Sequence, residues 1–192
     1  MVLKKFLKKI VAISFAVFVV IPPIYATGSS IPNIKVVNTG GKLVLNASLK
    51  NGLSEEIIEV IKSGVPVSIT YKVALKIKRP LFFNKKIDTR VIKRSVEYDI
   101  LQEEYKLFNN SGRKITTKNT DDLDEALLSL TTLENIPLIE TDKLNKDKKY
   151  FAEVKAQLNS KRSWFPFDYI LFFFPFLNFD TSWENSSSFS LK

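Results

Sequence analysis

Regular alternation of apolar and polar residues marks two segments of the chain as strands. In residues 67–77, apolar side chains from Val67 to Ile77 occupy every second position, and mostly polar side chains lie between them. Residues 150–158 alternate in the same way. Because successive side chains of a strand point to opposite faces of a sheet, this pattern predicts sheets with one buried and one solvated face. Sheets of this kind are typically antiparallel.

Shorter segments with apolar, β-branched or aromatic residues predict further strands. Turn signals separate several of them, notably Asn51-Gly52 and the run from Asn109 to Gly112. The additional strands are expected at residues 34–37, 42–49, 87–100, 103–108, 114–117 and 136–140, with strand character again at 183–191.

Two short helices are predicted from their start and stop signals. The first lies between Ser54, whose hydroxyl is placed to cap it, and Gly64, which is suited to end it. The second is expected at Asp121–Leu130, with Thr120 as its cap. Its apolar residues follow the i, i+3, i+4, i+7 spacing of a helix face. They are Leu123, Ala126, Leu127 and Leu130.

These elements predict an α+β, β-rich fold. We expect an antiparallel β-sandwich or curved sheet with two short helices across an open end. A parallel doubly wound fold is disfavoured, since two helices cannot supply enough crossover connections. Residues 42–192 are expected to form a single β-rich domain, preceded by a lead-in segment at 27–41.

Residues 1–26 have the order of a secretory signal peptide. Four lysines precede an apolar run at 10–21, two prolines follow, and the segment ends at Ala26. The run has twelve residues, whereas a membrane-spanning helix needs about 20. The alternative is an uncleaved N-terminal anchor, because Ile24 is bulkier than a cleavage site prefers. We therefore expect a periplasmic or otherwise exported protein, or one held at the inner membrane by that anchor.

The amino-acid composition excludes several kinds of covalent and catalytic chemistry. The chain has no cysteine and no histidine, so disulfides, thiol nucleophiles and imidazole catalysis are excluded. No catalytic motif is present, and we expect no enzyme activity, no metal and no cofactor. A hydrolase built on two carboxylates stays open, since any two acids can converge in a fold. Loss of residues 1–26 would lower the net charge from +9 to +5, and no dense basic stripe predicts nucleic-acid binding.

An aromatic-rich segment at 164–183 is the most conspicuous candidate surface. Pro166 and Pro175 forbid a continuous helix, so a second membrane span is not expected. Two interpretations remain: a core strand, or an exposed patch that contacts a membrane or a protein. Lys161 and Arg162 precede the segment and suit anionic headgroups. The candidate surface comprises Trp164, Phe165, Phe167, Phe172, Phe173, Phe174 and Phe176.

One stretch also resembles a known family. The residues NGLSEEIIEVIKSGVPVSITYKVAL at 51–75 are similar to the exported bacterial proteins catalogued as domain of unknown function 4390. YFAEVKAQL at 150–158 resembles a late strand of that family, and the likeness covers most of 34–191. RPLFFNKK at 79–86 departs from the family's Trp- or Arg-rich turn. The resemblance implies an envelope location, no known catalytic residue, and a membrane sensor kinase as a possible partner.

Together these observations predict a non-enzymatic exported binding or accessory domain that engages an envelope protein, such as a membrane sensor kinase. The first alternative is a membrane-surface or lipid-binding domain that uses the aromatic segment 164–179 on an anionic membrane. The second alternative is the carboxylate-based hydrolase.

Overall fold

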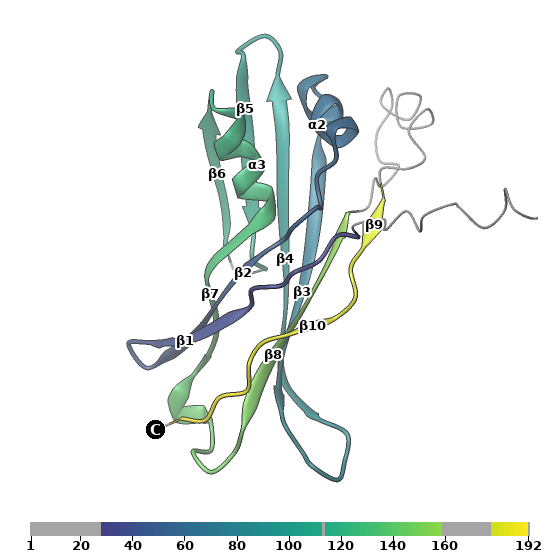
Figure 1. Ribbon diagram of the computed structural model, residues 1–192. Helices are drawn as coiled ribbons and strands as arrows, with labels where there is room; N and C mark the ends of the chain where they lie inside the picture. The colour runs from purple at the N-terminus through teal and green to yellow at the C-terminus, as the bar shows by residue number, and fades with distance from the viewer. Residues whose placement is uncertain (1–27, 113, 159–177, 192) are drawn as a thin grey trace, which may run out of the picture.

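The described residues form two antiparallel sheets, two short α-helices and one turn of 3-10 helix, η1 (Thr141–Lys143). The computed structural model describes residues 28–112, 114–158 and 178–191 (Figure 1). The small sheet has the order β1-β2-β7, and the large sheet has the order β10-β8-β3-β4-β5-β6, with β9 beside β8. The small sheet comprises β1 (Lys35–Thr39), β2 (Lys42–Ser48) and β7 (Thr132–Glu140). The large sheet comprises β3 (Val67–Ile77), β4 (Lys85–Asp99), β5 (Glu104–Asn110), β6 (Ile115–Thr120), β8 (Tyr150–Leu158), β9 (Phe179–Asp180) and β10 (Glu184–Asn185).

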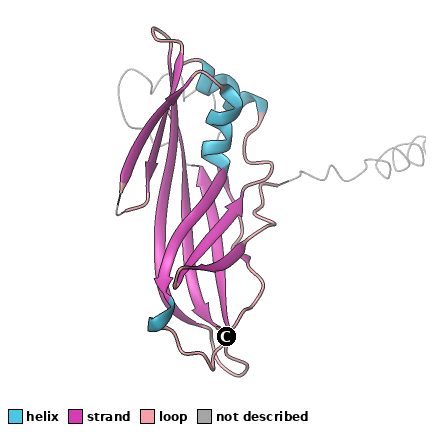
Figure 2. Cartoon of the chain, turned by 90° about the vertical axis from the view of Figure 1, so that its left-hand side faces the viewer, coloured by secondary structure: helices cyan, strands magenta, loops and turns pink. Residues whose placement is uncertain are grey.

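The sequence-based expectation of a β-rich α+β fold is confirmed. Every strand pair is antiparallel. The small sheet and the helices α2 (Glu55–Lys62) and α3 (Leu123–Thr131) lie on one side of the large sheet (Figure 2). Their inner faces enclose the core, which includes Tyr71 and Val73 of β3 and Leu45 of β2. Residues 35–39 of the lead-in form β1, which pairs with β2 along its whole length.

The C-terminal end of α3 joins the two sheets. The last carbonyl groups of a helix have no partner within the helix and need one elsewhere. The hydroxyl of Tyr71, on the large sheet, donates to the carbonyl of Leu130 at 2.6 Å. The backbone N–H of Leu49, just after β2, donates to the carbonyl of Thr131 at 2.8 Å. The C-terminal end of the helix is therefore held by one hydrogen bond to each sheet.

Both helix starts differ in detail from the sequence-based prediction. Ser54 is the N-cap of α2, but its side chain makes no capping bond. The side chain of Ser54 is instead hydrogen-bonded to Glu56, which lowers the pKa of that carboxyl. For α3 the cap is Asp122, whose carboxylate accepts from the N–H of Asp124 at 2.8 Å. Thr120 accepts from the N–H of Asp122 just before the helix, so the helix begins two residues later than expected.

Strand β7 begins directly after α3, four residues earlier than the predicted strand at 136–140. Thr132 already has an extended conformation, and it pairs with Ser48 of β2. Leu133 is fully buried and pairs with Ala47. Pairing with β2 and burial of Leu133 therefore extend the strand back to the helix, and no loop separates the two elements.

The C-terminal segment runs irregularly along β8, and its hydroxyl side chains accept hydrogen bonds from the backbone of β8. The N–H of Ala156 on β8 donates to the Thr181 hydroxyl at 3.0 Å. The N–H of Ala152 donates to the Ser186 hydroxyl at 2.9 Å. These bonds satisfy backbone groups of β8 that a regular neighbouring strand would otherwise pair. The serine-rich composition of this segment is therefore suited to its place along β8.

The long strands β3 and β4 reach beyond the core at one end. Their hairpin projects at the end of the molecule opposite the helices (Figure 1). Among the described residues, no helix combines the length and the apolar character needed to span a bilayer. The predicted signal peptide at 1–26 lies outside the described residues and stays a prediction.

Candidate functional site

A row of polar side chains crosses the inner face of the large sheet. Arg94 of β4 lies directly opposite Ile69 of β3 on one side and Asn109 of β5 on the other. Asn109 in turn lies opposite Thr116 of β6. Residues that are paired in register share one face of a sheet. Arg94, Asn109 and Thr116 therefore point to the side of the sheet that carries the core.

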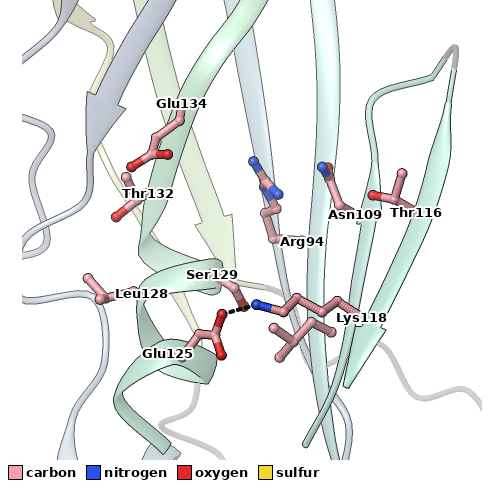
Figure 3. Close-up of a pocket in the computed structure, with 10 residues that line it drawn as sticks. Arg94, Asn109, Thr116, Lys118, Glu125, Leu128, Ser129, Thr132 and Glu134 are labelled. Atoms are coloured by element: carbon pink, nitrogen blue, oxygen red, sulfur yellow. Dashed lines mark hydrogen bonds and ion pairs between the residues drawn. The ribbon is translucent and has the colours of Figure 1, made fainter. Parts of the chain in front are cut away.

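The helix α3 and the start of β7 stand in front of this row, and a cavity that is open to solvent lies between them. Figure 3 shows Arg94, Asn109 and Thr116 on one side, with the residues of α3 and Glu134 of β7 around them. The cavity has a volume of about 430 Å³. Its lining is Arg94, Leu107, Asn109, Thr116, Lys118, Glu125, Leu128, Ser129, Thr132 and Glu134.

Two residues of the cavity lining each carry a buried polar atom that lacks a hydrogen-bond partner. The two atoms are Nε of Arg94 and Oδ1 of Asn109, the only such side-chain atoms in the described part of the chain. A buried polar group without a partner costs about 1–3 kcal/mol of stability. Both atoms belong to residues that line the same cavity and are paired across β4 and β5. The fold thus holds an unsatisfied donor and an unsatisfied acceptor on neighbouring residues of two paired strands.

The charges around the cavity balance. Lys118 forms an ion pair with Glu125 (Figure 3). The pKa of the Glu125 carboxyl is lowered, mainly by hydrogen bonding to Lys118. Burial lowers the pKa of the Arg94 guanidinium, while Tyr71 and Glu134 act in the opposite direction. Arginine stays cationic in proteins, so two cations face two carboxylates across the lining.

The cavity lining is rich in groups that can form hydrogen bonds. Its lining holds three hydroxyl residues and an amide, and it holds neither histidine nor cysteine. A general acid needs a raised pKa, whereas the pKa of Glu125 is lowered. In the ranges 28–112, 114–158 and 178–191, no group of three or more potential ligand residues is placed to hold a metal ion. What the lining offers is hydrogen bonding.

The sequence-based candidate surface is not the site described here. Trp164, Phe165, Phe167, Phe172, Phe173, Phe174 and Phe176 all lie outside the described residues, so that interpretation stays a prediction. The cavity was missed because strand register is needed to bring Arg94 next to Asn109. One signal was present: Arg94 shares the alternation phase of the buried Ile92 and Val96. An arginine at a strand position that the alternation assigns to the buried face indicates a polar site inside the fold.

Arg90 and Arg94 form a matched pair that tests this assignment. Arg90 lies on the same face of β4 and is fully engaged, donating to the Leu138 carbonyl at 2.7 Å and to Asp88 at 2.9 Å. Replacing Arg90 with methionine leaves those acceptors unpaired, so R90M is expected to lower the free energy of unfolding by about 1.5 kcal/mol. R94M removes an unsatisfied donor and is expected to raise it by about 1 kcal/mol. Urea titration of both variants measures the difference, and a loss in R94M equal to that in R90M would contradict it.

The fold and cavity define a β-rich α+β domain with a polar, charge-balanced pocket between a curved antiparallel sheet and a helix. The family model described as "Domain of unknown function (DUF4390)" matches residues 26–187. The chain belongs to this family. Searches of curated proteins and of solved structures found no significant match.

Proposed function

We propose that this protein is a non-enzymatic binding domain of the cell envelope, and that its cavity holds a peptide segment of a partner protein. The observation that carries the proposal is the pair of unsatisfied buried atoms, Arg94 Nε and Asn109 Oδ1, on two residues that line one cavity of about 430 Å³. A protein keeps unsatisfied buried groups at a cost to stability, and a ligand that satisfies them recovers that cost.

A peptide group matches the two unsatisfied atoms. The guanidinium of Arg94 offers only donors, so it needs an acceptor such as a carbonyl oxygen. The side-chain amide of Asn109 pairs with a peptide group in both senses, donating to its carbonyl or accepting from its N–H. An extended segment presents both kinds of group along its backbone. The two residues, opposite each other on β4 and β5, are placed to bind neighbouring groups of one segment.

Size and charge favour a short, uncharged portion of chain. Ligand pockets generally have volumes of about 300–1,000 Å³, and this cavity falls toward the lower end of that range. Two cations and two carboxylates in the lining leave no net charge to attract a free anion. Leu107 and Leu128 supply apolar contact at its edges. The combination suits a few residues of a partner better than a phosphate or a sugar acid.

The envelope location and the absence of catalysis are parts of the same proposal. Support for export comes from the basic, apolar and small-residue order of residues 1–26. Support for a non-enzymatic role comes from the lack of cysteine and histidine and from the engaged state of Glu125. A membrane sensor kinase, the partner implied by the family resemblance, is the proposed source of the bound segment.

Selection of short random peptides displayed on phage tests the cavity directly. Peptides are selected on the full chain, and their affinity is then measured by calorimetry for R94M, N109L and the control R79M. Arg79 is an exposed arginine outside the cavity, so R79M makes the same chemical change elsewhere. We expect R94M to weaken binding by about 10- to 100-fold, the range for a hydrogen bond to a charged group. Equal affinity of R94M and R79M would rule out the cavity as the peptide site.

Site-specific crosslinking in the native membrane tests the partner. A photoreactive residue replaces Leu128, an exposed residue at the cavity rim, or Val37, an exposed residue on β1. A crosslink to the sensor kinase from position 128, absent from position 37 and lost when R94M is added, is the expected result. Crosslinks of equal yield from both positions would contradict a role for the cavity.

A further inference from the structure

The tip of the β3–β4 hairpin exposes three large apolar side chains. Leu81, Phe82 and Phe83 are 87%, 76% and 99% exposed. They follow one another in the turn at 78–84, at the end of the molecule opposite the helices (Figure 1). Single exposed apolar residues are common, but a contiguous exposed group indicates an interaction surface.

Four cations stand immediately behind the apolar tip. Lys78 and Arg79 precede it, and Lys85 and Lys86 follow it, all of them exposed. None of the four forms an ion pair with a described residue, whereas the next lysine along β3, Lys76, pairs with Glu153. Positive charge is therefore concentrated at the base of the tip and left unneutralised.

The hairpin base is fixed in place and is flanked by more lysines. The N–H of Arg79 donates to the Asn84 side chain at 3.1 Å, which closes the turn. The N–H of Lys78 donates to the carbonyl of Lys149 at 2.8 Å. This bond ties the hairpin to the loop between β7 and β8, which carries the exposed Lys146 and Lys148 as well. The basic surface thus extends from the hairpin onto its neighbouring loop.

The turn at the other end of the large sheet has the opposite charge. Leu101, between β4 and β5, is 96% exposed, but its neighbours in the chain are acidic. Asp99, which is paired with Lys106, precedes it, and Glu103 and Glu104 follow it. One end of the long strand β4 is thus apolar and basic, while the other end is apolar and acidic. An anionic surface would attract the first end and repel the second.

We propose that the β3–β4 hairpin tip inserts into the interface of an anionic lipid bilayer. The tip is a protruding turn with apolar side chains outermost and cations one layer behind, which follows the order of acyl chains and headgroups across the interface. Stable membrane attachment requires two signals, and an apolar insertion together with a basic cluster provides them. This inference is independent of the cavity and of the segment 164–179, because it rests only on residues 76–86 and their described neighbours.

A local reporter tests the insertion in the full chain. Because the chain has no cysteine, a single environment-sensitive dye is attached through L81C or, as the matched control, through L101C. Vesicles contain phosphatidylcholine with an equal amount of phosphatidylglycerol, or phosphatidylcholine alone. The expected result is a blue shift of the dye at position 81 on the anionic vesicles and no shift at position 101. The local signal is needed because residues 1–26 carry their own lysines and apolar run.

Two sets of changes separate the apolar and ionic contributions. F82S/F83S is expected to lower the ratio of inserted to free tip at least about tenfold at every salt concentration, since burial of phenylalanine drives insertion. K85S/K86S is expected to lower it about 30-fold at low salt, because each lysine contributes about 1 kcal/mol of attraction to an anionic surface. The effect of K85S/K86S should shrink at high salt because of screening. R94M should leave the dye signal unchanged.

Several results would overturn the proposal. One is an unresponsive dye at position 81 on anionic vesicles, which would leave an acidic protein surface as the partner of the tip. Another is an equal shift at positions 81 and 101, which would mean that the chain inserts without using the hairpin. A third is an equal response on vesicles of phosphatidylcholine alone, since the lysines would then have no role.

Discussion

Replacement of Leu130 by alanine is expected to lower the free energy of unfolding by about 3 kcal/mol, within the range of about 2–5 kcal/mol for truncating a buried leucine. Leu130 is fully buried at the end of α3. The loss has two parts, the transfer free energy of the removed methyl groups and the cavity that they leave. The site is poorly able to collapse, because the backbone of Leu130 and Thr131 is bonded to both sheets. Urea denaturation followed by circular dichroism measures the change.

Leu128 provides the control for this experiment. It lies two residues earlier on the same helix and is 61% exposed. Leu128→Ala therefore removes the same atoms without opening a cavity in the core, and it is expected to change stability by less than about 0.5 kcal/mol. Similar losses in the two variants would mean that α3 packs on the sheets through a different face from the one described here.

Replacement of Tyr71 by phenylalanine is expected to cost about 2 kcal/mol. The side chain of Tyr71 is buried, and its hydroxyl is the partner of the Leu130 carbonyl. Phenylalanine keeps the ring packing but leaves that carbonyl without a donor, inside the protein and at the end of a helix. Because α3 forms one wall of the cavity, the same change should also weaken peptide binding. Ala126→Gly can be compared with Tyr71→Phe, because it destabilises α3 while the hydrogen bond from Tyr71 to the Leu130 carbonyl is kept.

The dependence of the unfolding free energy on pH, in the alkaline range, offers a second test of the role of Tyr71. Burial raises the pKa of its hydroxyl above the ordinary value of 10.0. Above about pH 10 the unfolded chain releases the Tyr71 proton while the folded chain retains it. The stabilisation from this group is therefore complete below pH 10 and is lost as the pH rises beyond it. The unfolding free energy of the wild type should fall more steeply above pH 10 than that of Y71F, and equal slopes would contradict the assignment.

Local sequence signals were sufficient for most of the strands and helices. The alternation at 67–77 and 150–158 corresponds closely to β3 and β8. The helix signals located α2 and α3 to within about two residues, the usual uncertainty at helix ends. These features depend on side chains near one another in sequence, so the sequence alone carries them.

The start of β7 and the cap of α3 were not predicted correctly, for a common reason. Thr132 and Leu133 are extended because β2 pairs with them, and β2 is far away in the sequence. Asp122 replaces Thr120 as the helix cap, and two candidate caps so close together cannot be ranked from local preference. Long-range pairing with β2 decided the first case.

The candidate site also shows the difference between what local sequence determines and what the tertiary structure determines. The sequence by itself determined the class of fold, the absence of cysteine and histidine chemistry, and the basic, apolar composition of 78–86. Only the tertiary structure decided that Arg94 and Asn109 stand side by side beneath α3 and that the Phe82 and Phe83 rings are exposed. The physical reason is that alternation specifies which face a side chain takes within its own strand. Which residues it meets across the sheet depends on register, and whether it is covered depends on the layer packed above it.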